Sequence, residues 1–505
     1  MAMALSGAGR AGGSRDIRTS SSPAEAAFYV CALASYDEIK TVLVRYERTS
    51  TAGLLLSATL WQCEGDVLRA EVALRRAVES APETERPYVV DFLAPLLISR
   101  GLFARAAALL GTAEIPPALE AGRFALRSVI DAAAGNIKLS EEHGSAARDA
   151  LVRLDDDVVR LRVHQRLAMA AYYRGRGIEA LDEVAQGLRS ARLLAAHRAA
   201  CTLHSVAYAT YYSITGDFDE AWRQAYALAR EADLGGDQSC RALGRVAIYE
   251  LAAERGDDTE VSIARAALEA EPLSEQYRER FAGGVADVLR LAWRGEFAAC
   301  RNVLVVLKDA TGRTDSERAL CRAMLALVSV ALGDDDAARR FSRQAISTSA
   351  RPQKHIVAYE MRYRRLARAL AAIAGDFVGD VVRGRRAADA RFLREDADVT
   401  ALLQLRSSTL AGRMPLSVRG YARFVDMVRD TLVRRPSIGP LTEAEVEILR
   451  MLDAGRNAPQ IATILSRSPH TVRTHIRNAS AKLEARGRMD MLARARQLGI
   501  VTESR

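Results

Sequence analysis

The chain has 505 residues, of which 49% are hydrophobic, 27% charged and 6% aromatic, and it carries a formal net charge of +9 with a pI near 9.4. This length is too great for one hydrophobic core, and the composition favours an all-α protein and excludes disorder throughout. The positive charge suits a partner that carries phosphates, although net charge also serves solubility. No stretch approaches the roughly 18 apolar residues of a membrane span and we find no pattern of a secretory leader, so we expect a cytoplasmic protein.

The chain begins with a segment of low complexity. Residues 1–22 are rich in Gly, Ser and Arg, a composition that cannot bury enough apolar surface to fold. We therefore expect a disordered N-terminal segment over residues 1–22.

A periodic pattern of glycines follows over residues 23–410. These glycines interrupt helical patterns at intervals of roughly 34 to 42 residues, a period typical of a helical-pair solenoid. Several of them precede a similar amphipathic segment, which we interpret as the second helix of a pair. The glycines are Gly65, Gly101, Gly135, Gly175, Gly216, Gly256, Gly295, Gly333 and Gly375.

The first of these units shows the physical logic of the pattern. Gly65 permits a tight turn, Ala70 and Ala77 let neighbouring helices approach closely, and Pro82 stops the helix. This resembles a tetratricopeptide repeat. The same alanine offsets follow two further glycines, as Ala106 with Ala113 and as Ala338 with Ala345.

Other units depart from that pattern. The unit at Gly216 has Leu228 at the second alanine offset, so its close-approach position is expected to shift by one residue, and the units at Gly295 and Gly375 match only in part. The alternative interpretation is an irregular all-helical domain with glycine-terminated helices. Either interpretation predicts an α-helical region.

A helical-pair array leaves a concave surface that commonly holds a peptide, a partner protein or a small effector. Which of these ligands binds here is not encoded in a recognisable pattern. Aromatic residues could line such a groove, but aromatics at helical spacing more often belong to the core. They are Tyr172, Tyr173, Tyr208, Tyr211, Tyr212 and Trp222.

Residues 411–438 are predicted to form a basic amphipathic helix and a linker. The linker, PSIGP, contains two prolines and a glycine, which places a domain boundary near Gly439. Residues 439–505 are then predicted to form a separate C-terminal domain.

This C-terminal domain contains three helix start signals. Thr442 with Glu445 and Asn457 with Gln460 form capping boxes, and Gly455 stops the first helix. Ser468 caps the third helix, whose first position is Pro469, so a short turn separates the second and third helices. This spacing predicts a helix-turn-helix. The apolar positions expected to close its core are Val446, Leu449, Leu452, Ile461, Ile464, Leu465, Val472, Ile476 and Leu483.

The polar side of the third helix carries the candidate DNA-binding residues. Arginine can read guanine in the major groove with two hydrogen bonds, and a threonine can contact a thymine methyl. The segment 467–488 has six Lys or Arg residues against one Glu, which favours binding to phosphates over a merely solvated face when combined with the helix-turn-helix. We predict base-reading roles for His470, Arg473, Thr474 and Arg477, and phosphate contacts for Ser468, Thr471, Lys482 and Arg467.

Over nearly its whole length this domain resembles the LuxR-type (GerE-like) helix-turn-helix. The residues that carry the resemblance include Thr442, Glu445, Gly455, Ile461-Ala462, Ser468, Thr471-Val472, His475, Asn478, Lys482-Leu483 and Arg488. The resemblance implies four helices, of which the third reads DNA and the fourth, about residues 488–498, pairs two copies. It also implies that His475 packs and forms hydrogen bonds, whereas Arg467 and Ala458 depart from the family pattern.

The repeats followed by this domain resemble the C-terminal half of the large ATP-binding LuxR regulators. Their ATPase module has no counterpart here, because there is no GxxxxGK[ST] motif and none of the lysines follows a glycine-rich loop. The lysines are Lys40, Lys138, Lys308, Lys354 and Lys482. The six cysteines show no CxxC motif or pairing rhythm, so we expect buried, reduced thiols. They are Cys31, Cys63, Cys201, Cys240, Cys300 and Cys321.

The sequence therefore predicts a DNA-binding transcriptional regulator, favouring an activator. Its expected partners are double-stranded DNA, a second copy of the chain, an unidentified effector on the repeats and RNA polymerase. We expect no enzyme activity, because no nucleophile with a base, paired catalytic carboxylates or metal-ligand cluster stands out, and we expect no cofactor and no bound metal. The alternative is a helical-repeat scaffold for protein partners with a weak DNA-binding domain, favoured only by the departure at Arg467.

Overall fold

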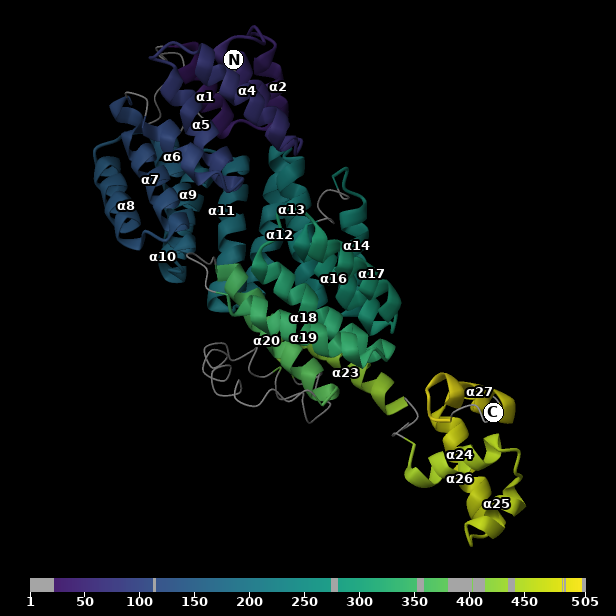
Figure 1. The fold of residues 1–505 in the computed structure, drawn as a ribbon. Helices are drawn as coiled ribbons and strands as arrows, with labels where there is room; N and C mark the ends of the chain where they lie inside the picture. Colours follow the sequence, from purple (N-terminus) through teal and green to yellow (C-terminus); the bar gives the residue numbers. More distant parts are fainter. Residues whose placement is uncertain are drawn as a thin grey trace. The chain divides into compact units, whose positions relative to one another are not determined.

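The computed structural model describes residues 22–111, 115–273, 280–351, 358–379, 402, 414–434, 441–483, 485 and 487–501. Within these ranges the regular elements are helices and no strand occurs, which confirms the all-α prediction (Figure 1). The chain divides into two compact units, residues up to Met427 and residues from Val428. The predicted disordered segment, except Ser22, lies outside the described residues, as does the end of the predicted repeat region between 380 and 410, except Leu402.

The first unit consists of antiparallel helical pairs. Its helices are α1 (Pro23–Leu33), α2 (Tyr36–Leu43), α3 (Thr51–Cys63), α4 (Val67–Ser80), α5 (Arg86–Ser99), α6 (Phe103–Gly111), α7 (Pro117–Ala134), α8 (Ile137–Val152), α9 (Asp157–Tyr173), α10 (Gly177–Leu193), α11 (His197–Thr210), the π-helical turn η3 (Tyr211–Thr215), α12 (Phe218–Gly235), α13 (Gln238–Arg255), α14 (Asp258–Glu269), α16 (Phe281–Trp293), α17 (Phe297–Asp309), α18 (Asp315–Leu332), α19 (Asp335–Ser349) and α20 (Ala358–Phe377). Helix α23 (Arg419–Arg434) follows.

Eight of the nine predicted glycines form the turn inside a helical pair. Each has a left-handed backbone conformation, with φ from +71° to +88°, which costs glycine nothing because it has no Cβ. After six of these glycines the next residue donates its N–H back across the turn, as Asp66 does to the Trp61 carbonyl at 2.8 Å, and this satisfies a free carbonyl at the helix end. This regular pairing confirms the tetratricopeptide-like prediction over an irregular helical domain. The eight glycines are Gly65, Gly101, Gly135, Gly175, Gly216, Gly256, Gly295 and Gly333.

The prediction for the ninth glycine is wrong. Gly375 lies inside α20, which continues to Phe377, and the residue with the left-handed conformation is Gly379, with φ +67°. Because a second glycine four residues later supplies the turn, the helix passes through Gly375. Periodic glycine spacing alone could not distinguish these two positions.

The predicted close-approach residues lie at helix contacts. Leu228 is fully buried, and the neighbouring Ala229 meets Gly244 of α13, where an added Cβ would come within 3.1 Å of the Ala229 Cβ. The expected one-residue shift in this unit is therefore confirmed. In the unit after Gly295 the larger Leu307 is accommodated by Gly284, whose added Cβ would lie 2.5 Å from Leu307 Cδ2. Fully buried predicted alanines are Ala70, Ala77, Ala106, Ala338 and Ala345, and Ala113 lies outside the described residues.

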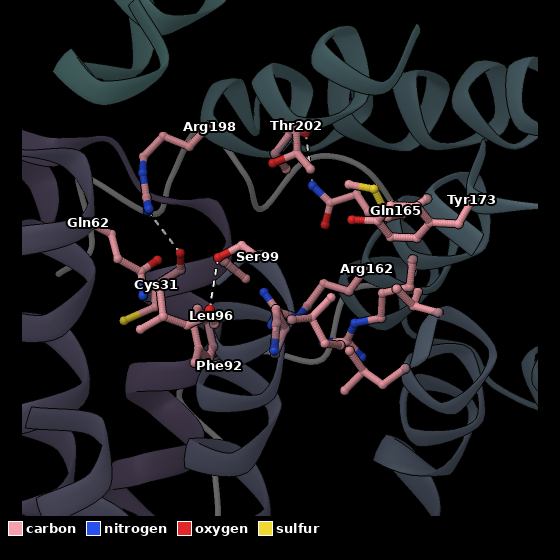
Figure 2. Close-up of a pocket in the computed structure, with 18 residues that line it drawn as sticks. Cys31, Gln62, Phe92, Leu96, Ser99, Arg162, Gln165, Tyr173, Arg198 and Thr202 are labelled. Atoms are coloured by element: carbon pink, nitrogen blue, oxygen red, sulfur yellow. Dashed lines mark hydrogen bonds between the residues drawn. The ribbon is translucent and has the colours of Figure 1, made fainter. Parts of the chain in front are cut away.

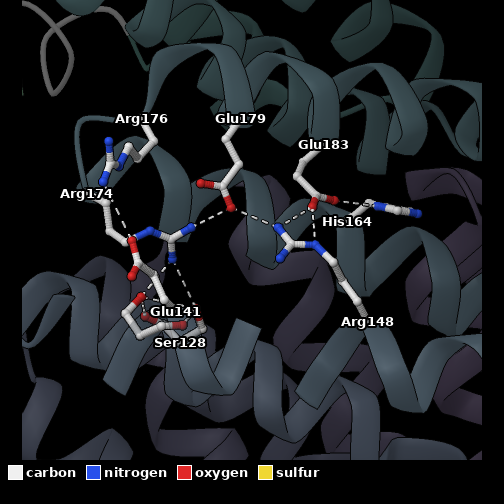
Figure 3. Close-up of polar contacts among 9 residues, drawn as sticks. Ser128, Glu141, Arg148, His164, Arg174, Arg176, Glu179 and Glu183 are labelled. Carbon is white, nitrogen blue, oxygen red and sulfur yellow. Dashed lines mark hydrogen bonds and ion pairs between the residues drawn. The ribbon is translucent and has the colours of Figure 1, made fainter. Parts of the chain in front are cut away.

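A network of polar side chains joins the α7/α8 pair to the α9/α10 pair (Figure 3). Arg148 of α8 donates to Glu183 at 2.8 and 3.0 Å and to Glu179 at 2.8 Å, both on α10. His164 of α9 lies 2.7 Å from the second oxygen of Glu183. Burial alone would raise the pKa of Glu183, but its bonds to His164 and Arg148 lower that pKa below the ordinary value. The ionised carboxylate therefore stabilises this contact between repeats.

The helix that precedes the C-terminal domain in the chain, α23, begins against the repeats. An added Cβ at Gly420 would lie 2.0 Å from the Ala253 carbonyl oxygen, so the two backbones approach closely. Trp293 Nε1 donates to the Gly420 carbonyl at 3.1 Å, and Arg423 lies over the Trp293 ring and donates to Asp258 at 2.5 Å. The first half of α23 is thereby tied to α13, α14 and α16.

Two further predictions concern cysteines and membrane spans. All six cysteines are free, five of them buried and Cys240 half-buried, which agrees with the expectation of reduced thiols. In the described part of the chain, no helix combines the length and the apolar composition required to cross a bilayer.

Candidate nucleic-acid interface

After the end of α23, the described residues of the second unit form four helices: α24 (Glu443–Asp453), α25 (Ala458–Ile464), α26 (Pro469–Lys482) and α27 (Arg488–Gln497). Both predicted capping boxes are present. Glu445 N donates to Thr442 Oγ1 at 3.3 Å and Thr442 N donates to Glu445 Oε2 at 2.8 Å, and Asn457 and Gln460 make the same reciprocal pair. Polar side chains thus satisfy the free N–H groups where α24 and α25 begin.

The turn between α25 and α26 is short and sharply bent. Ser466 takes a left-handed conformation, with φ +52°, and Ser468 Oγ accepts the Thr471 N–H at 3.0 Å. Helix α26 then begins at the predicted Pro469. The helix-turn-helix and its caps are therefore confirmed.

The core of this unit agrees with most, but not all, of the predicted positions. Ile464 is 47% exposed, so its predicted core position is wrong, and Val446 is half-buried. On α24, the predicted Leu449 and Leu452 are buried, and Ile448, which was not predicted, takes the third core position. Ile464 is the last residue of the seven-residue helix α25. Because the helix ends there, helical spacing does not predict which side of the domain this residue faces. Fully or nearly buried core residues are Ile448, Leu449, Leu452, Ile461, Ala462, Val472, Ala479, Leu483, Met491, Leu492, Ala495 and Val501.

Three of the four predicted base-reading side chains are exposed on one side of α26. His470, Arg473 and Arg477 are exposed, whereas Thr474 is half-buried and donates its hydroxyl to the His470 carbonyl at 3.1 Å. Val472 and Ala479, on the opposite side, are buried. Within the described residues, no hydrogen bond or ion pair engages the guanidinium group of Arg473 or Arg477. These two charges are available to an external partner.

The predicted phosphate-contacting residues gather around the N-terminus of α26. The Ser468 and Thr471 hydroxyl oxygens lie 2.8 Å apart, and Arg467 donates through Nη1 to His475 Nε2 at 3.2 Å. All of these side chains except those of Thr471 and His475 are exposed. The helix dipole places a partial positive charge at this end, which favours an anion there.

Lys482, the remaining predicted phosphate contact, forms an ion pair within the domain. Its Nζ lies 2.6 Å from Glu445 Oε2, and its side chain is 18% exposed. Burial alone would raise the pKa of Glu445, but the bonds from Lys482 and Thr442 lower it below the ordinary value. The ammonium charge is thus compensated inside the domain, where it ties α26 to α24. This contact spans 37 residues and has no local sequence signal.

Several other arginines of this domain are also engaged. Arg488 donates to the Leu452 and Arg456 carbonyls at 3.1 and 3.0 Å, and Arg496 pairs with Asp453 at 2.6 Å. They hold α27 against α24. Unlike Arg473 and Arg477, Arg488 and Arg496 are therefore engaged in contacts inside the domain.

Comparison with known proteins supports the assignment of this unit. Residues 439–495 match the model of the family described as bacterial regulatory proteins, luxR family (GerE). The LuxR resemblance is confirmed for these residues, which form a LuxR-type DNA-binding domain, and this domain implies DNA-binding transcriptional regulation. No curated protein matches the sequence of the chain.

One solved structure to which the chain is similar is a signal transduction ATPase with numerous domains (STAND) protein with a tetratricopeptide repeat sensor, from Pyrococcus horikoshii. The TM-score is 0.37 and the sequence identity 11%, over 77% of this chain and 56% of the archaeal chain. This chain thus spans little more than half the length of that protein, and we carry no function over from it.

Proposed function

We propose that the chain is a sequence-specific transcriptional regulator in which α26 enters the major groove of DNA. The observation that carries this proposal is the pair of exposed guanidinium groups at Arg473 and Arg477, one helical turn apart and unengaged by any described residue. Leaving two charges unpaired beside each other is unfavourable for an isolated helix, and guanine O6 and N7 would compensate both. His470 and Thr474 complete the proposed base-reading side.

The proposed phosphate contacts surround the start of α26. Ser468 and Thr471 present hydroxyl groups where the helix dipole is positive, and Arg467 is exposed beside them. Such contacts fix how a helix-turn-helix lies on the duplex but carry no sequence information. We assign Lys482 to the ion pair with Glu445 and not to this set.

We further propose that α27 pairs two copies on DNA and that the repeats sense an effector. Met489 and Leu498, in and directly after α27, are 80% and 66% exposed, which gives this region apolar surface for a second copy. The first half of α23 is anchored on the repeats through Gly420, so a change in the repeats has a mechanical route to the start of the linker. Activation of transcription, with contact to RNA polymerase, is the outcome that the LuxR resemblance favours.

Binding of the full chain to a pool of genomic promoter fragments at several salt concentrations tests this proposal. Because each neutralised phosphate releases counterions, the logarithm of the affinity should fall steeply and linearly with the logarithm of the salt concentration. Arg473→Ala and Arg477→Ala should each weaken binding to an enriched fragment by about 1–3 kcal/mol. Arg105→Ala, which removes an exposed arginine of α6, controls for net charge and should have little effect. Binding that is absent or insensitive to salt would instead favour the protein scaffold.

A further inference from the structure

The first helices of successive pairs surround a pocket of about 500 Å³ (Figure 2). At this pocket α1 contacts helices that are distant in the sequence. Tyr29 of α1 donates to Asp156, the N-cap of α9, at 2.7 Å, and Arg198 of α11 donates to the carbonyl of Cys31 in α1 at 3.0 Å. Residues of α1, α3, α5, α7, α9 and α11 line it. The volume lies within the range of small-molecule sites.

One wall of this pocket is a pair of buried arginines. Arg162 and Arg166 of α9 both contact a single carboxylate, that of Asp91 on α5, at 2.7 and 2.6 Å. Their side chains are 14% and 8% exposed. Two guanidinium groups therefore share one negative charge in a largely desolvated place.

The backbone is shaped to hold these arginines. Pro95 inside α5 has no N–H, so the Asp91 carbonyl four residues earlier has no helical donor, and Arg162 and Arg166 donate to it at 3.0 and 3.2 Å. Gly122 of α7 makes room on the other side, because an added Cβ there would lie 2.5 Å from Arg166 Nη1. A proline and a glycine, both unfavourable inside helices, thus occur where they admit the guanidinium groups.

A third arginine adds to the positive charge. Arg198 has a 12% exposed side chain, and its Nε is buried without a hydrogen-bond partner, 3.7 Å from the nearest oxygen of Asp237. Burial raises the pKa of the neighbouring Cys31 to about 11 and of Cys63 to about 12, so both are neutral thiols. Three cations therefore face two carboxylates, those of Asp91 and Asp237.

Arg162 is a desolvated charge that also feels repulsion from a second guanidinium group. Burial, together with repulsion from Arg166, lowers the pKa of Arg162 below its ordinary value despite the attraction of Asp91. An added anion would relieve this repulsion, because a carboxylate accepts two hydrogen bonds from a guanidinium group. Beside the arginines the lining is apolar and includes Leu96, Leu126, Val129 and Met169.

We propose that this pocket binds a small organic acid, with its carboxylate at the arginines and an apolar body against the aliphatic lining. Figure 2 shows Gln62 and Arg198 at one end of the pocket, Gln165 and Tyr173 at the other, and Arg162 between them. The inference rests on the proposed effector-sensing role of the repeats and names the chemistry of the effector. A ligand in this place contacts α1, α3 and α5 together with α7, α9 and α11, so its binding stabilises the packing among these helices.

Calorimetric titration of the full chain with octanoate and 1-naphthoate tests the proposal, with 1-octanol and 1-naphthalenemethanol as uncharged controls of the same shape. At least one of the two acids should bind with one site per chain, and its alcohol should bind at least tenfold more weakly. Failure of both acids to bind, or equal binding of acid and alcohol, would overturn the proposal.

Variants distinguish the pocket from other apolar surfaces. Arg198→Gln removes a pocket charge, and Thr202→Trp fills the mouth at an exposed position without touching an ion pair. Each should weaken acid binding at least tenfold, whereas Arg189→Gln, an exposed arginine of α10 outside the pocket, should not. Thermal melting without ligand checks that each variant is folded, and Thr202→Trp keeps the test valid if Arg198→Gln does not fold. Unchanged acid binding by folded Thr202→Trp would show that the acid does not bind in this pocket.

DNA binding measured in the same samples separates the pocket from the regulatory role. Acid binding that depends on the pocket and changes DNA affinity supports both proposals. Acid binding that depends on the pocket but leaves DNA affinity unchanged supports the site and contradicts sensing through it. No acid binding, with DNA affinity that responds to a cell extract, contradicts the site and leaves effector sensing to another part of the repeats.

Discussion

A buried cluster of carboxylates next to α23 allows a quantitative test of how the repeat unit is stabilised. Glu254 of α13 and Arg362 of α20 have side chains 1% and 5% exposed, and Arg362 Nη2 lies 2.9 Å from Glu254 Oε2. Arg362 also donates to the Ser417 carbonyl at 2.8 Å. Tyrosine hydroxyl groups surround Glu250, one turn before Glu254, and Tyr208 donates to it at 2.7 Å. Burial raises the pKa of both Glu250 and Glu254, and the neighbouring Glu254 carboxylate raises that of Glu250 further, to about 7.

Replacing Arg362 with methionine keeps much of the side-chain volume but leaves Glu254 buried without a cation. Breaking a buried ion pair from one side typically costs about 3–5 kcal/mol, since the remaining charge stays desolvated. We expect this cost near pH 8. Because Glu250 lies beside Glu254, the variant also brings two carboxylates together without any neutralising charge.

The cost should depend on pH in a defined direction. A glutamate whose folded-state pKa lies above its unfolded value of about 4.5 binds a proton more readily in the folded state, so its contribution to stability falls as pH rises through that window. Removing Arg362 raises the pKa of Glu254 further. The Arg362→Met variant should therefore be closest to wild type near pH 5.5 and least stable near pH 8.

Thermal melting of the full chain followed by circular dichroism at both pH values measures this effect. The double variant Arg362→Met with Glu254→Gln should be more stable at pH 8 than Arg362→Met alone, because the orphan charge is gone. Arg223→Met, which removes an exposed ion pair with Glu220, is the matched control and should change stability by less than about 1 kcal/mol. Equal melting of the single and double variants, or no dependence on pH, would refute the reasoning.

Three further predictions concern contacts in both units. Glu183→Gln should lower the free energy of unfolding by about 1–2 kcal/mol at neutral pH, less than the loss of a fully buried pair because Arg148 is partly exposed. Since the pKa of Glu183 is lowered in the folded state, this difference from wild type should vanish as pH falls below the unfolded-state pKa of about 4.5. Urea denaturation measures the difference, and a difference that stays constant with pH would contradict the prediction. Gly284→Ala should cost about 1–3 kcal/mol by overpacking against Leu307, and a double-mutant cycle with Leu307→Ala should show coupling, whereas additive effects would argue against the contact. Lys482→Gln should lower the melting temperature of the DNA-binding domain but leave the salt dependence of DNA binding unchanged. Arg467→Gln should reduce the slope of log affinity against log salt concentration by about 1. The opposite pattern would mean that Lys482 contacts phosphates.

Local signals in the sequence predict local features of this fold well. Thr442, Asn457 and Ser468 cap the helices they were expected to cap, because an N-cap and its partner lie only three residues apart. Left-handed turns likewise coincide with glycine at eight predicted positions. Gly375 and Ile464 show the limit of local reasoning. The turn expected at Gly375 occurs at the second glycine, Gly379, and Ile464 is exposed because it lies at the end of a short helix.

Features that depend on distant partners could not be predicted in this way. Arg162 and Asp91 are 71 residues apart, and no spacing rule connects them, although Pro95 inside a helix is a signal that a carbonyl needs another donor. Lys482 had the residue type and location of a phosphate contact, but Glu445 on another helix compensates its charge. Whether a basic residue is available to DNA is decided by its tertiary neighbours.

The central claim, that α26 reads base edges, is tested most directly by the sequence preference of the protein. Selection of bound sites from a random DNA library should be carried out with the wild type, Arg473→Ala and Arg477→Ala. If these arginines read bases, each substitution should relax the preference at one or two specific positions of the selected site while the other positions stay unchanged. An identical preferred site for all three proteins, with only weaker binding, would mean that the arginines contact phosphates and would contradict the claim.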